Sequence, residues 1–255
     1  MPRIVVLSDK GPSSYYLINR LLANNILVGV VFEKRPVKSL LVVLKARVRR
    51  IGLFGVINQV LLGLYTRLLE KPKDTKTISK IFSDQPTEYL IRDVDKLEVK
   101  SINHVSVKDF IVSKSPDLVI VNGTSILKTP MIELLPQRII NIHVGTTPEY
   151  RGTHGGFWAI YNGEKEMVGV TVHLIDKGID SGAILFQEKV TIARGDTLRG
   201  IVYKQQKAGV DLVFKCLDGY NNRTLSSFHK PNSRSKLYYS PGLTHYLKYL
   251  FRQRK

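Results

Sequence analysis

The chain has 255 residues, 43% of them hydrophobic, and a formal net charge of +18 at pH 7. This length and apolar content allow one α/β domain with a substantial core, alone or with a small appendage. The single cysteine, Cys216, excludes an internal disulfide, and the apolar run of residues 4–7 is too short for the core of a signal peptide. Both observations predict a protein of the reducing cytoplasm.

The excess of positive charge is concentrated in two segments. Residues 34–73 contain ten Lys or Arg against one acid, Glu70, and the chain from Arg223 onward contains no acid. Such segments indicate acidic partners, which are nucleic acid, anionic lipid, or phosphorylated and polyglutamate-bearing small molecules. The remainder of the chain is closer to neutral, so the charge belongs mainly to two additions to the central domain.

The rest of the sequence predicts strands that alternate with helices. We expect strands over residues 3–7, 26–32, 116–121, 138–143, 168–175 and 183–190. We expect helices over residues 15–22, 130–135, 153–161 and 196–217. The alternation indicates a Rossmann-like, doubly wound and mostly parallel sheet flanked by helices, in which ligands bind at the carboxyl ends of the strands.

Residues 34–72 interrupt this alternation. A basic stretch at residues 45–50 precedes an uncharged run at 51–66, which is shorter than the about 20 apolar residues of a spanning helix. One interpretation is an amphipathic helix that lies on an anionic membrane surface. The favoured interpretation is a basic helical hairpin that packs on the domain or at a homodimer interface.

Residues 221–255 form a short basic extension after a catalytic domain expected to span residues 1–220. Four tyrosines interleave with basic residues there: Tyr238, Tyr239, Tyr246 and Tyr249. This pattern permits contact with nucleic acid or lipid head groups. Packing of a final helix is the favoured interpretation, and nucleic acid is not an expected partner.

The central segment carries the residues with the clearest chemistry. Asn141 and His143 alternate on one predicted strand, so their side chains share a face. Asp180 follows His143 by 37 residues, in a turn flanked by glycines. We expect the amide and the imidazole to converge on one carbonyl oxygen, while the carboxylate favours the imidazolium and accepts an amine's proton. This set predicts transfer of an acyl group to an amine.

The order of the surrounding motifs is more specific than any single one of them. The set comprises Asn141-Ile-His143, Pro148-Glu-Tyr-Arg-Gly152, His154, Gly163, Gly169-Val-Thr-Val-His173 and Asp180-Ser-Gly182. It resembles the formyltransferase family, which uses 10-formyltetrahydrofolate and includes glycinamide ribonucleotide, methionyl-tRNA and nucleotide-sugar formyltransferases. The resemblance is strong over residues 115–217, weak over 1–33 and absent from 34–72 and the tail.

The resemblance implies roles for individual residues. Asn141, His143 and Asp180 would form the catalytic set, with the first two stabilising the oxyanion and Asp180 positioning His143 and taking the amine's proton. The co-substrate 10-formyltetrahydrofolate would bind, without a metal, between one wall of Asn122, Gly123, Thr124 and Ile126 and a second wall of Asp176, Lys177, Gly178 and Ile179.

Departures from the family pattern bear on the acceptor amine. The glycine-rich phosphate loop of glycinamide ribonucleotide enzymes is replaced by residues 8–14, and the tail is too short for the β-barrel of tRNA-acting enzymes. Many relatives carry Ser-Leu-Leu-Pro where this chain has Gly145-Thr-Thr-Pro148. By elimination, a nucleotide-linked amino sugar or another small amine is the favoured acceptor, with glycinamide ribonucleotide and methionyl-tRNA as alternatives.

Four further side chains are candidates for binding the acceptor: Lys10, Arg151, His154 and Trp158. For the two basic residues the alternative is a solvated surface charge, and for His154 it is a capping or packing role. For Trp158 the alternative is a place in the core.

Two other classes of function compete with formyl transfer. A zinc hydrolase would use His143, His154 and His173 with an aspartate, although no closely spaced histidine pair supports it. For His173 a structural, hydrogen-bonded role is favoured. A non-catalytic relative would be recruited to anionic membrane or RNA through its basic segments, but the presence of Asn141, His143 and Asp180 favours an enzyme.

Overall fold

A seven-stranded sheet forms the centre of the molecule. The computed structural model describes residues 2–36, 40–84, 86, 94–135 and 138–254, without side-chain surroundings for 40–43, 253 and 254. The strand order is β3-β2-β1-β4-β5-β7-β8, and the pairs from β3 through β5 are parallel, whereas β7 is antiparallel to β5 and β8. The strands are β1 (Ile4–Ser8), β2 (Leu27–Glu33), β3 (Lys96–Val99), β4 (Leu118–Asn122), β5 (Arg138–His143), β7 (Gly169–Leu174) and β8 (Ile184–Lys189).

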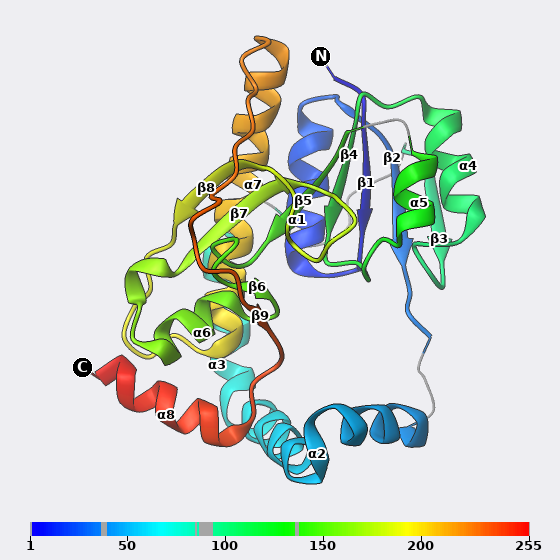
Figure 1. Ribbon diagram of the computed structural model, residues 1–255. Helices are drawn as coiled ribbons and strands as arrows, with labels where there is room; N and C mark the ends of the chain where they lie inside the picture. The colour runs from blue at the N-terminus through cyan, green and yellow to red at the C-terminus, as the bar shows by residue number, and fades with distance from the viewer. Residues whose placement is uncertain (1, 37–39, 85, 87–93, 136–137, 255) are drawn as a thin grey trace.

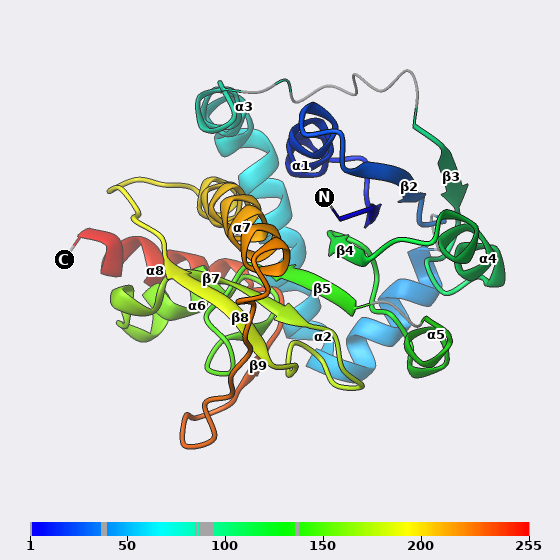
Figure 2. The same cartoon turned by 90° about the horizontal axis from the view of Figure 1, so that it is seen from above.

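Helices cover both faces of this sheet (Figure 1; Figure 2). The β1 side chains alternate, so that Ile4 and Val6 pack in one apolar cluster and Val5 and Leu7 in another. The first cluster contains residues of α1 (Pro12–Ala23) and α7 (Leu198–Asn221). The second contains residues of α4 (Val105–Lys114) and α5 (Thr129–Leu134). The predicted doubly wound, mostly parallel sheet is confirmed.

A third apolar cluster lies at one end of the sheet and is rich in aromatic rings. It joins α6 (Gly155–Asn162) to α8 (Leu243–Arg254), and it includes Phe157, Trp158, Tyr246 and Tyr249. A 3₁₀ turn (Lys165–Met167) and a two-stranded ribbon of β6 (Arg151–Gly152) and β9 (Leu237–Tyr238) complete this end. Because Tyr246 and Tyr249 are buried, the favoured packing of a final helix is confirmed.

The basic insertion is helical over most of its described length. It consists of α2 (Leu40–Tyr65), a π-helical turn η1 (Thr66–Glu70) and α3 (Lys71–Ile81). In Figure 1, α2 runs along the lower edge of the molecule next to α8. The helical segment ends at Ile81, nine residues beyond the predicted end of the insertion at residue 72. Its last helix is held on the domain, because Asp74 of α3 is buried and accepts a hydrogen bond from Thr197 at the start of α7.

Candidate functional site

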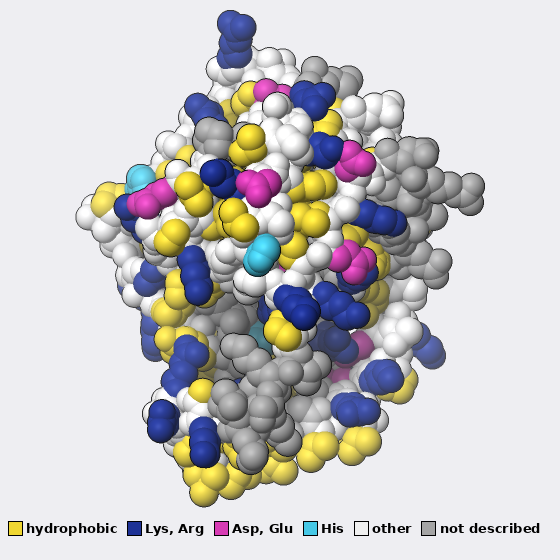
Figure 3. All heavy atoms as spheres, turned by 90° about the vertical axis from the view of Figure 1, so that its right-hand side faces the viewer, with side chains coloured by type: hydrophobic (Ala, Val, Ile, Leu, Met, Phe, Trp, Pro, Cys, Tyr) yellow, Lys and Arg dark blue, Asp and Glu magenta, His cyan; other side chains and the backbone are white. Residues whose placement is uncertain are grey.

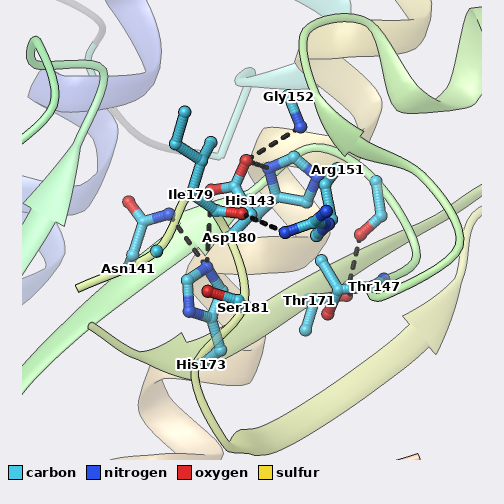
Figure 4. Close-up of polar contacts among 12 residues, drawn as sticks. Asn141, His143, Thr147, Arg151, Gly152, Thr171, His173, Ile179, Asp180 and Ser181 are labelled. Atoms are coloured by element: carbon cyan, nitrogen blue, oxygen red, sulfur yellow. Dashed lines mark hydrogen bonds and ion pairs between the residues drawn. The ribbon is translucent and has the colours of Figure 1, made fainter. Parts of the chain in front are cut away.

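The pairing of β5 with β7 brings the central polar residues together. Asn141 lies opposite His173 and His143 opposite Thr171 in the antiparallel register. The loop between β7 and β8 then returns Asp180 over the carboxyl end of β5 (Figure 4). Three segments that are separate in the sequence therefore contribute to one polar cluster.

Asp180 is the centre of this cluster. Its Oδ2 atom lies 3.3 Å from Nδ1 of His143, and its Oδ1 atom lies 3.6 Å from Nε2 of His173. The backbone N–H of Gly152 donates to Oδ2 at 2.9 Å. Burial by itself raises the pKa of Asp180, but the attraction of the protonated His143 ring, the nearby His173 ring and the hydrogen bond from Gly152 outweigh it and lower the pKa to about 2. Asp180 is therefore ionised at neutral pH.

His143 lies behind Asp180, away from solvent. Its side chain is 4% exposed, and its Nε2–H donates to the backbone carbonyl oxygen of Tyr150 at 2.8 Å. Burial lowers the pKa of His143, and the nearby Asp180 carboxylate opposes this shift in part. Nδ1, which faces that carboxylate, is therefore the ring nitrogen that can accept a proton.

Asn141 is held by His173. Its Nδ2–H donates to Nε2 of His173 at 3.2 Å, and Nδ1–H of His173 donates to the carbonyl oxygen of Leu174 at 2.8 Å. These bonds give His173 the hydrogen-bonded structural role that we favoured. The second amide hydrogen of Asn141 remains for a ligand.

A cleft opens over this cluster. Asn141, His173 and Asp180 line it, together with six of the eight predicted folate-binding residues: Gly123, Thr124, Ile126, Asp176, Gly178 and Ile179. The other two lie elsewhere, since Asn122 is buried and donates to Ser14 Oγ at 3.2 Å, and Lys177 forms an ion pair with Glu133 at 2.7 Å.

The expected convergence of Asn141 and His143 on one oxygen is not what the geometry provides. Asn141 lines the cleft, whereas the His143 ring is enclosed between Asp180 and the Tyr150 carbonyl. The shared strand face is therefore correct, but the loop that carries Asp180 comes between His143 and the cleft.

The four candidate acceptor residues do not line this cleft among the described residues. Lys10 forms an ion pair with Glu98 at 2.6 Å, and Arg151 donates to the carbonyl oxygen of Ile179 at 3.1 Å. Trp158 is in the aromatic cluster, as the core interpretation expects, where its Nε1–H donates to the carbonyl oxygen of Tyr239 at 2.9 Å.

His154 directly precedes α6 but does not cap it with its side chain. Its φ of 58° is in the left-handed region, and its side chain makes no capping hydrogen bond to the described residues. Burial lowers the pKa of His154 to about 4, so the ring is neutral at pH 7. The capping role is therefore wrong, and a packing role fits the structure.

Glu33 is a residue of the site that the sequence analysis missed. It accepts hydrogen bonds of 2.6 Å from the backbone N–H and from the hydroxyl of Ser125, which lines the cleft. Arg35 pairs with Glu33 at 3.1 Å and donates to the carbonyl oxygen of Gly123 at 2.7 Å. Burial raises the pKa of Glu33, but the bonds from Ser125 and its neighbours outweigh this and lower it. In the sequence, Glu33 could have been noticed as an acid that directly follows a predicted strand and precedes a basic segment.

The cluster does not present a set of metal ligands. Among the residues that the structure describes, no three His, Cys, Asp or Glu side chains are grouped so that they could hold a metal ion. The histidines proposed for a zinc site are divided, because His143 and His173 flank Asp180 whereas His154 directly precedes α6.

The part of the chain that contains this cluster matches a known protein family. Residues 65–217, which include the whole cluster, match the formyl transferase family. The chain belongs to this family. The match begins at the carboxyl end of α2, so most of the basic insertion lies outside it.

Individual formyl transferase relatives share only part of their length with this chain. The methionyl-tRNA formyltransferase of Finegoldia magna is 30% identical over 128 residues, which are 50% of this chain and 41% of that protein. The GDP-perosamine N-formyltransferase of Brucella melitensis is 33% identical over 98 residues, which are 38% of each protein. The chain thus covers less than half the length of these two curated relatives.

The fold is shared with solved formyl transferases. The N-formyltransferase of Helicobacter canadensis, solved with folinic acid and dTDP-3-aminofucose, has a TM-score of 0.57 to this chain at 19% identity. The superposition covers 93% of this chain and 71% of that one.

Proposed function

We propose that this formyl transferase moves a formyl group from 10-formyltetrahydrofolate to a primary amine, using Asn141, His143 and Asp180. The observation that carries the proposal is one ionised carboxylate, Asp180, between two histidines on the floor of a cleft that Asn141 also lines. Family membership supports the choice of the formyl group among acyl groups.

The cleft fits a reduced folate. A pterin is a flat ring system with polar edges, and the cleft combines apolar side chains with open backbone groups in two facing loops, at residues 123–127 and 175–180. Glu33 and Arg35 hold the first loop, and Arg151 holds the second through the Ile179 carbonyl. Both walls are therefore preorganised for a ligand.

The chain's own residues handle charge and protons. When bound, the donor supplies the formyl carbon that the amine attacks, so that the amine nitrogen gains the formyl group and N10 of tetrahydrofolate gains a proton. Asn141 donates its free amide hydrogen to the oxyanion that develops on the formyl oxygen. Asp180 accepts the proton that the amine loses. Nδ1 of His143, on the side of Asp180 away from the cleft, stabilises this proton or receives it from the carboxyl group.

The favoured acceptor is a nucleotide-linked amino sugar. Two relatives support this class, because the Brucella protein is a GDP-perosamine N-formyltransferase and the Helicobacter N-formyltransferase was solved with dTDP-3-aminofucose. A cytoplasmic location fits the proposal, since Cys216 is a buried free thiol.

A screen for released tetrahydrofolate tests the proposal. The purified full chain is incubated with 10-formyltetrahydrofolate and, in separate reactions, with dTDP- and GDP-linked amino sugars, glycinamide ribonucleotide or methionyl-tRNA. We expect consumption of the donor only with an amino-sugar nucleotide, and loss of that consumption in Asn141→Ala. Turnover of another acceptor would correct the acceptor class, whereas no turnover with any amine would reject formyl transfer.

A further inference from the structure

The insertion presents a continuous apolar stripe to the outside of the molecule. The stripe comprises Leu53, Phe54, Ile57, Leu64, Leu68 and Leu69, and its most exposed members, Phe54 and Leu68, are 74% and 72% exposed. With the exposed Leu61, steps of three and four residues connect positions 53, 57, 61, 64 and 68, which places these side chains on one side of α2 and η1. Figure 3 shows hydrophobic side chains gathered along the lower edge, where α2 lies in Figure 1. We call this the α2–η1 apolar surface.

The opposite side of the same helix packs against the protein and carries several hydrogen-bonded polar groups. Asn58 is buried, donates to Thr244 Oγ1 at 2.7 Å, and accepts from the Thr244 backbone N–H at 3.0 Å. Gln59 donates to the carbonyl oxygen of Ser240 at 2.7 Å, and Glu70 accepts from the hydroxyl of Tyr246. The inward side therefore combines these polar groups with the buried Val56 and Leu62, while the large apolar side chains of the stripe remain exposed on the outer side, where a helix facing water normally carries polar residues.

Positive charge surrounds the α2–η1 apolar surface. Lys45, Arg47, Arg49 and Arg50 precede it, and Arg67 lies within its carboxyl-terminal end. The only acids of residues 34–81 are Glu70 and Asp74, and both are buried. An apolar stripe with cationic flanks matches the boundary between anionic head groups and acyl chains.

We propose that the α2–η1 apolar surface docks the enzyme on an anionic lipid membrane, with α2 lying along the membrane plane. The stretch Leu44–Ile81 is long and apolar enough to cross a membrane by length and composition. The inward bonds of Asn58, Gln59 and Glu70 instead hold the helix along the domain, which favours an interfacial position.

A second copy of the chain is a poorer partner for this surface. A two-fold contact would place the same surface against itself and bring the two sets of basic residues together. An anionic membrane neutralises these charges, and it also covers the exposed leucines. The inference does not depend on the proposed formyl transfer, because it uses no residue of the cleft.

Vesicle flotation of the full chain tests the proposal. The probes are phosphatidylcholine vesicles and vesicles of phosphatidylcholine mixed with phosphatidylglycerol. We expect flotation with the anionic vesicles and a fall in partitioning of about tenfold or more in the double variant Phe54→Ser/Leu68→Ser, since burying one such side chain is itself worth about tenfold. Arg47→Gln/Arg49→Gln should also weaken binding to the anionic vesicles. Added salt should weaken the binding of the wild type, because it screens the attraction between the basic residues and the lipid head groups.

The control removes exposed apolar side chains from another face. Val105 and Val112 of α4 are 60% and 46% exposed, and Val105→Ser/Val112→Ser should float as the wild type does. Absence of flotation with anionic vesicles, or equal flotation with both vesicle types, would overturn the proposal. The proposal would also be overturned if the wild type formed a dimer in solution and did not float, and if Phe54→Ser/Leu68→Ser dissociated that dimer.

Discussion

Asp180 Oδ2 lies 3.3 Å from Nδ1 of His143, on the other side of the ring from the Tyr150 carbonyl oxygen that accepts from Nε2 at 2.8 Å. Each ring nitrogen of His143 therefore faces an oxygen acceptor, and only the imidazolium donates to both. Burial opposes that charged form and lowers the pKa of His143. In the proposed mechanism, this pair takes up one proton during the reaction and releases it afterwards.

Replacing the carboxylate should remove the proton acceptor. In Asp180→Asn we expect kcat for formyl transfer to fall by about 10²–10⁴-fold, the range for loss of a general acid or base. The measurement is the initial rate of tetrahydrofolate release at saturating donor and acceptor. The matched control is Asp211→Asn, which removes an exposed carboxylate of α7 that pairs with Arg20 of α1, and it should retain the wild-type rate. An unchanged rate in Asp180→Asn would contradict the assigned role.

The lowered pKa of Asp180 predicts a pH-dependent contribution to stability. The group titrates near 3.8 when unperturbed and at about 2 in the folded protein, so its ionised form stabilises the fold above the unperturbed pKa. The difference corresponds to about 2 kcal/mol, which is lost as the pH falls from about 4 toward 2.

Urea unfolding of the wild type and of Asp180→Asn measures this contribution. The gap between their free energies of unfolding should be wide at neutral pH and should narrow as the pH falls below about 4. A gap that stays constant over this range would show that the fold does not perturb the titration of Asp180.

Gly145 allows His143 and the Tyr150 carbonyl to approach each other. A Cβ atom at position 145 would lie 2.6 Å from Nε2 of His143 and would also press on the Tyr150 carbonyl oxygen. We therefore expect Gly145→Ala to destabilise the fold by about 1–3 kcal/mol, as in other overpacked sites, and to reduce kcat. Thermal unfolding and the transfer assay measure the two effects.

Gly63 of α2 provides the contrasting case. A Cβ at this position meets no described atom within 4 Å, and the residue is helical. Gly63→Ala should stabilise the protein by about 0.5–1 kcal/mol through helix propensity, without changing kcat. If Gly145→Ala and Gly63→Ala had the same effect on stability and on kcat, the close approach at Gly145 would be contradicted.

Glu33 should affect binding of the folate more than the chemical step. In Glu33→Gln, an amide N–H₂ group faces the N–H and O–H donors of Ser125 and Ile102 that the carboxylate accepts from. A buried donor that loses its acceptor in this way costs about 1–3 kcal/mol of folding free energy. We expect a raised KM for the folate donor with a smaller change in kcat, because the wall at residues 123–126 is displaced while Asn141 and Asp180 stay in place.

Glu98→Gln serves as the control for Glu33→Gln. Glu98 is on the same edge of the sheet and pairs with Lys10, but its side chain is 50% exposed. Its substitution should leave both KM and kcat at wild-type values. A fall in kcat without a change in KM for Glu33→Gln would show that Glu33 does not act through the cleft wall.

Local patterns were sufficient for most of the sheet. The strand at residues 138–143 has the predicted bounds, because an apolar run between turn residues is a local signal, and Thr197 caps α7 near the predicted start. The edge strand β3 and helix α4 were missed. Only Val99 of β3 is buried, and α4 buries only Val107 and Ile111, so neither shows a strong apolar period.

The sequence by itself determined the family, the sheet, and the strand face shared by Asn141 and His143, because these depend on residue order and side-chain alternation. Only the tertiary structure decided that His143 lies behind Asp180, that Glu33 holds Ser125 across 92 residues, and that Leu53, Phe54 and Leu64 of α2 face outward. That orientation of α2 comes from the bonds between Asn58 and Thr244, 186 residues apart. Such contacts join segments whose local patterns are independent, so they become visible only when the chain is folded.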